Sequence, residues 1–229
     1  METDERALLI TSHLQAELRK LLTMRFGENP TILVEMLIQF PASMADFAEK
    51  GADGRLLIEM GPITHVPYSV YNFLEMVRRF KKGAFHRNAG HVLQAMATMD
   101  QAATEADKTT SFTMAFQEYS PLFPHNQYTL GYAGRPGGPA FYISTIDNTQ
   151  NHGPASQGSK SEADSCFGKL HDEASIEVVK RMQKQPGKEK KGAGFISDKS
   201  NFIVIKSVRV VSPTDAGADI PTVNLDKDP

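Results

Sequence analysis

The spacing of apolar residues divides the chain into a helical start and a long series of strands. Near the N-terminus apolar residues recur at helical spacing, at Ile10, Leu14, Leu18 and Leu21. Asn29 before Pro30 predicts the start of a second helix, since asparagine caps helices and proline suits the first turn, and Phe40 is expected to end it. Ser43 predicts the cap of a third, short helix that stops at Gly51.

From Gly54 onward the pattern becomes that of strands separated by turns. Residues 54–60 form an apolar run that predicts a buried strand, and Pro67 opens a helix with one apolar face. A second helix is indicated by the apolar spacing of Ile176, Val179 and Met182. Further strands are expected at residues 84–87, 90–94, 128–133, 140–145, 167–170 and 202–211.

This succession of elements predicts a mainly β fold, a closed antiparallel β-barrel capped by two helices. Polar stretches at residues 95–111 and 149–165 predict long loops. We expect a helical N-terminal extension (residues 1–50), a barrel domain (residues 51–212) and a disordered tail rich in Asp and Pro (residues 213–229). The apolar stripe predicts that the extension packs on the barrel, and the alternative that it recruits a protein partner stays open.

Charge and cysteine content narrow the class of protein. The 229 residues carry a formal net charge of -2, which gives no general attraction to nucleic acid or to an anionic membrane. Basic residues 184–191 lack aromatic neighbours and predict a solvated loop. The acidic N-terminus and the lack of a long apolar run predict a soluble chain, and Cys166 as the one cysteine favours the cytoplasm. A lumenal location stays open if a targeting segment has been removed.

The sequence contains neither the motif of a phosphate-binding loop nor the spacing of a metal site. The glycine-rich residues 131–138 lack the Gly-Lys-Ser/Thr of a phosphate loop and predict a tight turn between strands. His86 and His91 are five positions apart and fall on opposite faces of a strand. His125 and His152 lie in predicted loops without an acidic partner at ligand spacing. We therefore expect neither a metal ion nor a cofactor.

Nucleophilic and acid–base chemistry also lack a clear constellation. Cys166 lies in a predicted strand and is expected to be a small buried apolar residue. Asp147, Glu162 and Asp164 lie in loops, where carboxylates are expected to shape turns or cap backbone groups.

Several short motifs follow one another in a fixed order along most of the chain. Residues 54–60 read Gly-Arg-Leu-Leu-Ile-Glu-Met, residues 85–87 read Phe-His-Arg, and Gln94 follows at short range. Residues 141–143 read Phe-Tyr-Ile, and residues 167–169 read Phe-Gly-Lys. In this order the motifs resemble those of the cyclophilin-type peptidyl-prolyl isomerases. The resemblance extends to Val211 and implies that the barrel is of the cyclophilin type.

The resemblance implies a site made of an arginine, an amide and an apolar pocket. Arg87 would donate a hydrogen bond to the prolyl nitrogen at the twisted transition state. Gln94 would orient Arg87 and hold a substrate carbonyl, and His86 would have a supporting role. The pocket would be shaped by His91, Val92, Tyr132, Ala133, Ala140 and Tyr142.

Part of this pocket departs from the family pattern. The family's pocket phenylalanine, methionine, glutamine and second phenylalanine correspond, in that order, to His91, Val92, Ala140 and Tyr142. Tyr132 stands where the family has an asparagine. The family's histidine loop is replaced by residues 149–165, with Asp164 near the position of the histidine.

Two functions are compatible with these residues. The first is isomerisation of X-Pro bonds in peptides or proteins. The alternative is a catalytically weak or inactive module that binds proline-containing peptides or a protein partner. A purely structural role is a third hypothesis, and the retention of both Arg87 and Gln94 argues against it.

Overall fold

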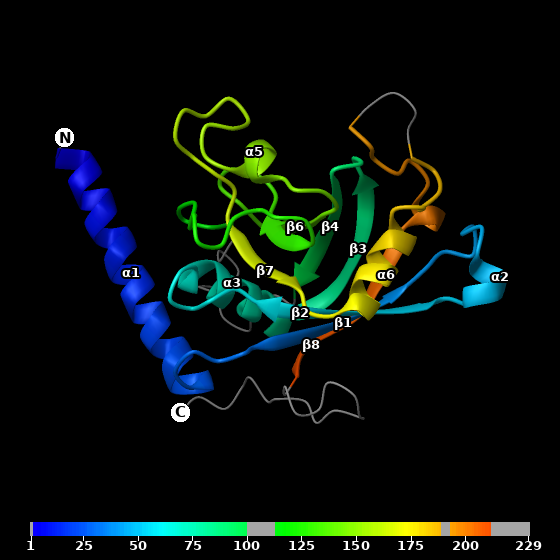
Figure 1. Ribbon diagram of the computed structural model, residues 1–229, viewed down its shortest axis with the longest axis horizontal. Helices are drawn as coiled ribbons and strands as arrows, with labels where there is room; N and C mark the ends of the chain where they lie inside the picture. The colour runs from blue at the N-terminus through cyan, green and yellow to red at the C-terminus, as the bar shows by residue number, and fades with distance from the viewer. Residues whose placement is uncertain (1, 100–112, 189–192, 212–229) are drawn as a thin grey trace.

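Eight antiparallel strands close into a barrel in the computed structural model, which describes residues 2–99, 113–188 and 193–211 (Figure 1). Around the barrel the strands follow the order β1-β2-β7-β5-β6-β4-β3-β8. Their bounds are β1 (Leu33–Gln39), β2 (Asp53–Met60), β3 (Phe80–Asn88), β4 (Val92–Met99), β5 (Thr129–Tyr132), β6 (Ala140–Ser144), β7 (Cys166–Leu170) and β8 (Ile203–Val211). The predicted closed antiparallel barrel is confirmed.

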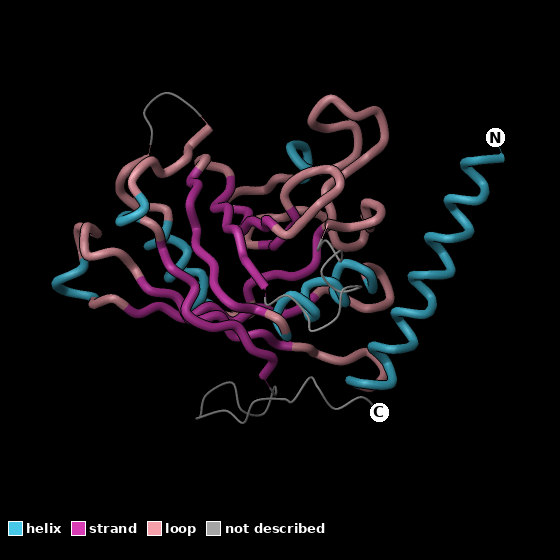
Figure 2. Tube along the Cα trace, turned by 180° about the vertical axis from the view of Figure 1, so that it is seen from behind, coloured by secondary structure: helices cyan, strands magenta, loops and turns pink. Residues whose placement is uncertain are grey.

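Helices lie outside the barrel (Figure 2). As predicted, two of them pack on it: α3 (Pro67–Arg78) contacts β7 and β8, and α6 (Glu173–Met182) contacts β2. The remaining helical segments are α1 (Glu2–Phe26), α2 (Phe47–Lys50), α5 (Thr149–His152) and the 3-10 helix η1 (Lys199–Asn201). Among the described residues no helix combines the length and apolar character needed to cross a membrane.

Aromatic side chains fill the space between α3 and the barrel. Phe73 of α3 stacks on Phe167 of β7 with ring centroids 4.2 Å apart. Phe141 of β6 meets Phe73 and Phe85 edge-on, with centroids 5.8 and 6.0 Å apart. Each such pair stabilises the fold by about 0.5–1.5 kcal/mol beyond the burial of its surface. Because the core is filled in this way, a ligand is expected to bind at the rim of the barrel rather than inside it.

The predicted second helix is wrong, because its residues form strand β1. β1 pairs with β2 on one side and with β8 on the other, so part of the expected helical extension belongs to the barrel. Asn29 has a positive φ of 49° and lies in a turn instead of capping a helix. Ser43 likewise caps no helix, since its hydroxyl donates to Asn201 Oδ1 at 2.5 Å, and α2 begins at Phe47.

Two predicted loops also contain regular structure. β4 continues to Met99, which pairs with Phe80 of β3, so the loop expected from residue 95 begins later. The loop predicted at residues 149–165 contains the short helix α5. The rest of the first loop, from residue 100, and the tail predicted at residues 213–229 lie outside the described residues.

Helix α1 packs on α3 through its C-terminal half. Leu18 and Leu22 are buried there, and Gln15 Nε2 donates a hydrogen bond of 2.7 Å to the buried carboxylate of Glu118. The stripe predicted from the sequence is therefore buried only in part, since Ile10 is 68% exposed. Figures 1 and 2 both show the N-terminal end of α1 standing away from the barrel.

One end of the barrel brings together two of its connecting segments. The β3–β4 turn and the connection between β6 and β7, which contains α5, lie side by side there (Figure 1). Backbone and side-chain hydrogen bonds join them: Thr145 N donates to His91 O at 3.0 Å, and Asn148 Nδ2 donates to the same oxygen at 2.9 Å. Residues far apart in the sequence thus share one rim.

Candidate functional site

Strands β3 and β4 place Arg87 directly opposite Gln94. The two residues are partners in the antiparallel register, and Arg87 Nη1 donates a hydrogen bond of 2.7 Å to Gln94 Oε1. Arg87 Nε donates to Ala193 O at 2.6 Å, and the guanidinium lies 5.2 Å from the centre of the Phe195 ring. A guanidinium has five N–H groups, so these contacts hold Arg87 while leaving donors for a ligand.

An irregularity in β3 separates His86 from Arg87. The register between β3 and β4 shifts between Phe85 and Arg87, as at a β-bulge, which changes the direction of a side chain. The His86 ring stacks on Phe195 at 6.0 Å and lines a separate groove of about 650 Å³ over β3, β4 and β8. His86 therefore lies outside the pocket of Arg87, although Phe195 contacts both side chains.

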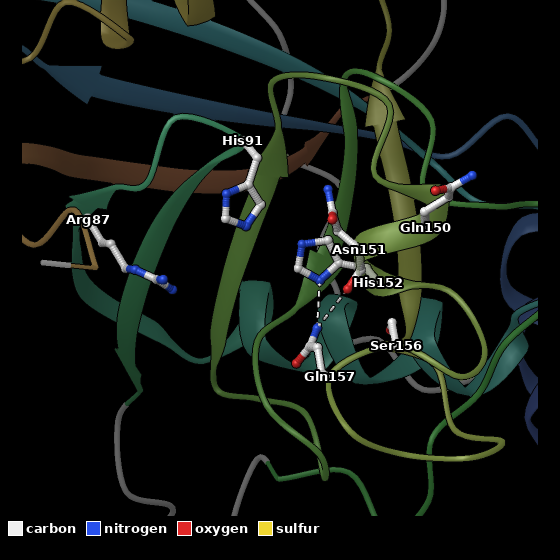
Figure 3. Close-up of a pocket in the computed structure, with 7 residues that line it drawn as sticks. All are labelled: Arg87, His91, Gln150, Asn151, His152, Ser156 and Gln157. Carbon is white, nitrogen blue, oxygen red and sulfur yellow. Dashed lines mark hydrogen bonds between the residues drawn. The ribbon is translucent and has the colours of Figure 1, made fainter.

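Arg87 lines a pocket of about 530 Å³ at the rim of the barrel (Figure 3). The other walls come from the β3–β4 turn and from the β6–β7 connection: His91, Gln150, Asn151, His152, Ser156 and Gln157. Figure 3 shows the Arg87 guanidinium directed toward the side on which the His91 and His152 rings lie. None of these described lining residues is acidic.

The residues expected to bind substrate are divided between the pocket and the core. His91 lines the pocket. Tyr132 belongs to the core, where its hydroxyl donates to Ser69 O at 3.1 Å and its ring packs on Phe167. The other four are not among the residues that line the pocket: Val92, Ala140 and Tyr142 are buried, and Ala133 is half-buried.

Asp164 is the centre of a buried polar cluster beneath this pocket. It is 1% exposed and accepts hydrogen bonds from Arg135 Nε at 2.8 Å, His152 Nδ1 at 2.6 Å and Gln157 Nε2 at 3.1 Å. The Tyr142 hydroxyl donates to the same carboxylate at 3.2 Å. Burial alone would raise the pKa of Asp164, but the hydrogen bonds and charges of His152 and Arg135 outweigh it and lower the pKa. The carboxylate is therefore ionised at neutral pH.

Hydrogen bonds in this region fix the orientation of its histidines. Because His152 Nδ1 faces the Asp164 carboxylate, we assign the ring proton to Nδ1. His152 Nε2 is buried and has no hydrogen-bond partner among the described residues. His125 Nε2 donates to Asp164 O at 2.8 Å, and burial lowers the pKa of His125 to about 4, which keeps it neutral. Burial lowers the pKa of His91 as well.

Stacked rings fill the place where the family resemblance implies an apolar pocket. The His152 ring stacks on Tyr142 at 4.6 Å and on His91 at 5.6 Å between centroids. Gly131 permits this arrangement, since a Cβ there would lie 2.7 Å from the Tyr142 hydroxyl oxygen. The wall that faces Arg87 is therefore aromatic but carries polar atoms.

Sequence reasoning missed the partnership between His152 and Asp164. The two residues are 12 positions apart in a segment without periodicity, and the sequence suggested only that Asp164 shapes a turn. The available signal lay in the family resemblance, in which Asp164 stands near the position of a histidine and Tyr142 corresponds to a phenylalanine. In the part of the chain that the structure describes, no three His, Cys, Asp or Glu side chains are grouped to hold a metal ion.

Comparisons with known proteins give a family match and a similar solved structure. The family model described as "Cyclophilin type peptidyl-prolyl cis-trans isomerase/CLD" matches residues 44–210. None of the curated proteins matches the chain. Among solved structures, the crystal structure of the mimivirus cyclophilin is similar over 82% of this chain and 93% of that chain, with 15% sequence identity and a TM-score of 0.49.

Proposed function

The chain belongs to the cyclophilin-type peptidyl-prolyl cis-trans isomerase family, and we propose that it isomerises X-Pro bonds of peptides or proteins with Arg87 as the donor to the prolyl nitrogen. The observation that carries this proposal is the 2.7 Å hydrogen bond that fixes Arg87 against Gln94 at the mouth of a pocket. Gln94 positions the guanidinium, and its amide nitrogen would hold a substrate carbonyl. His86 supports Phe195, on which the guanidinium rests.

The chemistry requires a well-placed donor and no nucleophile. Rotation of an X-Pro bond breaks the amide resonance, with a barrier of about 18–20 kcal/mol. In the twisted transition state the nitrogen regains its lone pair and accepts a hydrogen bond, which the planar ground state does not. A charge-assisted hydrogen bond contributes roughly 1.5–3 kcal/mol. Arg87 should therefore accelerate rotation by about tenfold to a hundredfold.

A second candidate function follows from the polarity of the pocket wall. His91 and the Tyr142–His152 stack stand where an apolar grip on the proline ring is expected. Less apolar surface is then buried by the ring, and binding should be weak. If Arg87 contributes little in this setting, the domain acts as a binding module for proline-containing peptides. The two functions differ in whether the bound X-Pro bond rotates faster.

Exchange NMR on a short amidated X-Pro peptide tests the proposal. The wild type is compared with Arg87→Ala and with a matched control, Arg78→Ala, whose side chain pairs with Glu75 on α3. We expect faster exchange with the wild type and the control, and a loss of more than tenfold in Arg87→Ala. Line broadening without faster exchange would favour the binding module, and an unchanged rate in Arg87→Ala would remove the proposed role of Arg87.

A further inference from the structure

The positive charge of Arg87 has no acidic partner among the described residues. Its contacts are the neutral Gln94 amide, the Ala193 carbonyl and the Phe195 ring. Two of its five N–H groups make these hydrogen bonds, which leaves three. The pocket is therefore lined by a guanidinium whose charge is not neutralised locally and which keeps donors for a ligand.

A second unsatisfied group lies in the opposite wall. His152 is 7% exposed and lines the pocket, yet its Nε2 makes no hydrogen bond to any described residue. Leaving a buried polar atom unpaired is unfavourable, and a ligand group that pairs with it recovers that loss. Asp164 holds the other ring nitrogen at 2.6 Å and so fixes the orientation of the ring whose Nε2 is unpaired.

The negative charge of the cluster beneath the pocket is paired inside the cluster, where Arg135 Nε lies 2.8 Å from Asp164 Oδ1. The Asp164 carboxylate already accepts from four side chains, and it is 1% exposed. The lining side chains other than Arg87 and the two histidines are Ser156 and amides: Gln150, Asn151 and Gln157. The lining thus combines amide and hydroxyl donors with the positive charge of Arg87, a combination that favours an anion.

We propose that this pocket binds an anionic group, a carboxylate or a phosphate, carried by the peptide within one residue of its proline. The inference rests on the proposed function, because it is Arg87 at the X-Pro bond that brings the flanking residue to the pocket. Neighbouring residues of an extended peptide are about 3.3–3.6 Å apart per step, so a flanking side chain reaches this pocket. The three remaining N–H groups of Arg87 allow it to contact both the prolyl nitrogen and the anion.

Peptide titrations followed by NMR test this substrate class. Amidated peptides carry Ala, Lys, Asp or phosphoserine immediately before or after the proline, and the dissociation constant and the exchange rate are both measured with the full chain. We expect at least one acidic peptide to bind tenfold or more tightly than its Ala counterpart, with Lys the weakest. Asp against phosphoserine distinguishes a carboxylate from a phosphate. Equal affinities for Ala and acidic peptides would overturn the inference.

A salt titration of the wild type and a matched pair of variants distinguish loss of anion binding from a folding defect. In the wild type, raising the salt concentration should weaken the acidic peptides but not the Ala peptide. His152→Gln should lower the preference for acidic over Ala peptides, measured as the ratio of their dissociation constants, by at least tenfold. His171→Gln, which replaces an exposed histidine beside Glu59, should leave that ratio unchanged. A preference that persists in His152→Gln or resists salt would contradict the inference.

The two proposals fail in distinguishable ways. Acceleration of all peptides with equal affinities would leave the isomerase and remove the anion pocket. Tight binding of acidic peptides without acceleration would leave the pocket and remove the isomerase.

Discussion

Replacing Asp164 by Asn tests whether the buried cluster stabilises the rim of the barrel. The substitution keeps the shape of the side chain and removes its charge. Arg135 is then left with its guanidinium largely buried and without a counter-charge, since its side chain is 10% exposed. Breaking a buried ion pair by removing one partner costs about 3–5 kcal/mol. Against a typical domain stability of about 5–15 kcal/mol, this is a large loss.

The assay is urea unfolding at neutral pH, followed by far-UV circular dichroism because the chain has no Trp. A matched control is Glu59→Gln, which removes a carboxylate on a more accessible side chain (28% exposed) that lies 3.3 Å from Lys169 and 3.0 Å from His171. Exposed pairs of this kind contribute about 0–1 kcal/mol. A free energy of unfolding for Asp164→Asn equal to that of the control would refute the reasoning.

The pH dependence of the free energy of unfolding is a second test of the role of Asp164. The pKa of Asp164 is lowered in the folded protein, so on acidification the unfolded chain takes up the proton first. The contribution of Asp164 is complete above the unfolded pKa of about 4 and is lost as the pH falls through the folded value. Asp164→Asn should lack this part of the acid-dependent loss, and an identical acid profile would contradict the assignment.

Two further predictions concern buried groups outside the pocket lining. His125 has a pKa of about 4 in the folded protein against an ordinary value of 6.5. On acidification the unfolded chain therefore binds the proton first. The free energy of unfolding should fall by on the order of 3 kcal/mol as the pH drops from 6.5 toward 4. His125→Gln should flatten that slope in urea unfolding, and equal slopes would contradict the assignment. Glu118→Ala removes the acceptor shared by Gln15, Tyr68 and Ser69 and should cost roughly 2–3 kcal/mol. Hydrogen exchange in α1 should become faster, and unchanged protection would show that other contacts hold α1.

Elements with a strong local signal could be predicted from the sequence. The apolar run at residues 54–60 and the i, i+3, i+4 spacing after Pro67 each favour one structure, and both elements form as expected. The closeness of Arg87 and Gln94 also follows from short range, because adjacent strands joined by a tight turn bring such positions together. The local sequence pattern therefore predicts several elements of the barrel and the Arg87–Gln94 pair of the site.

Strand β1 shows where local pattern fails. Residues 32–38 are mostly apolar, and a short apolar run fits a buried strand as well as a helix. The choice is made by pairing with β2 and β8, since Val34 pairs with Ile58 and Val210, which lie 24 and 176 positions away. The His152–Asp164 pair is hidden for a related reason, since irregular loops place it and no periodicity predicts their course.

The central claim is that Arg87 acts on the twisted amide and not on peptide binding. The measurement that tests it most directly is the exchange rate of an X-Pro peptide at saturating protein, together with its dissociation constant, for the wild type and Arg87→Ala. The account predicts a rate in the bound state at least tenfold lower in Arg87→Ala for a neutral peptide, with a dissociation constant changed by much less. A variant that binds more weakly but rotates bound peptide as fast as the wild type would contradict it.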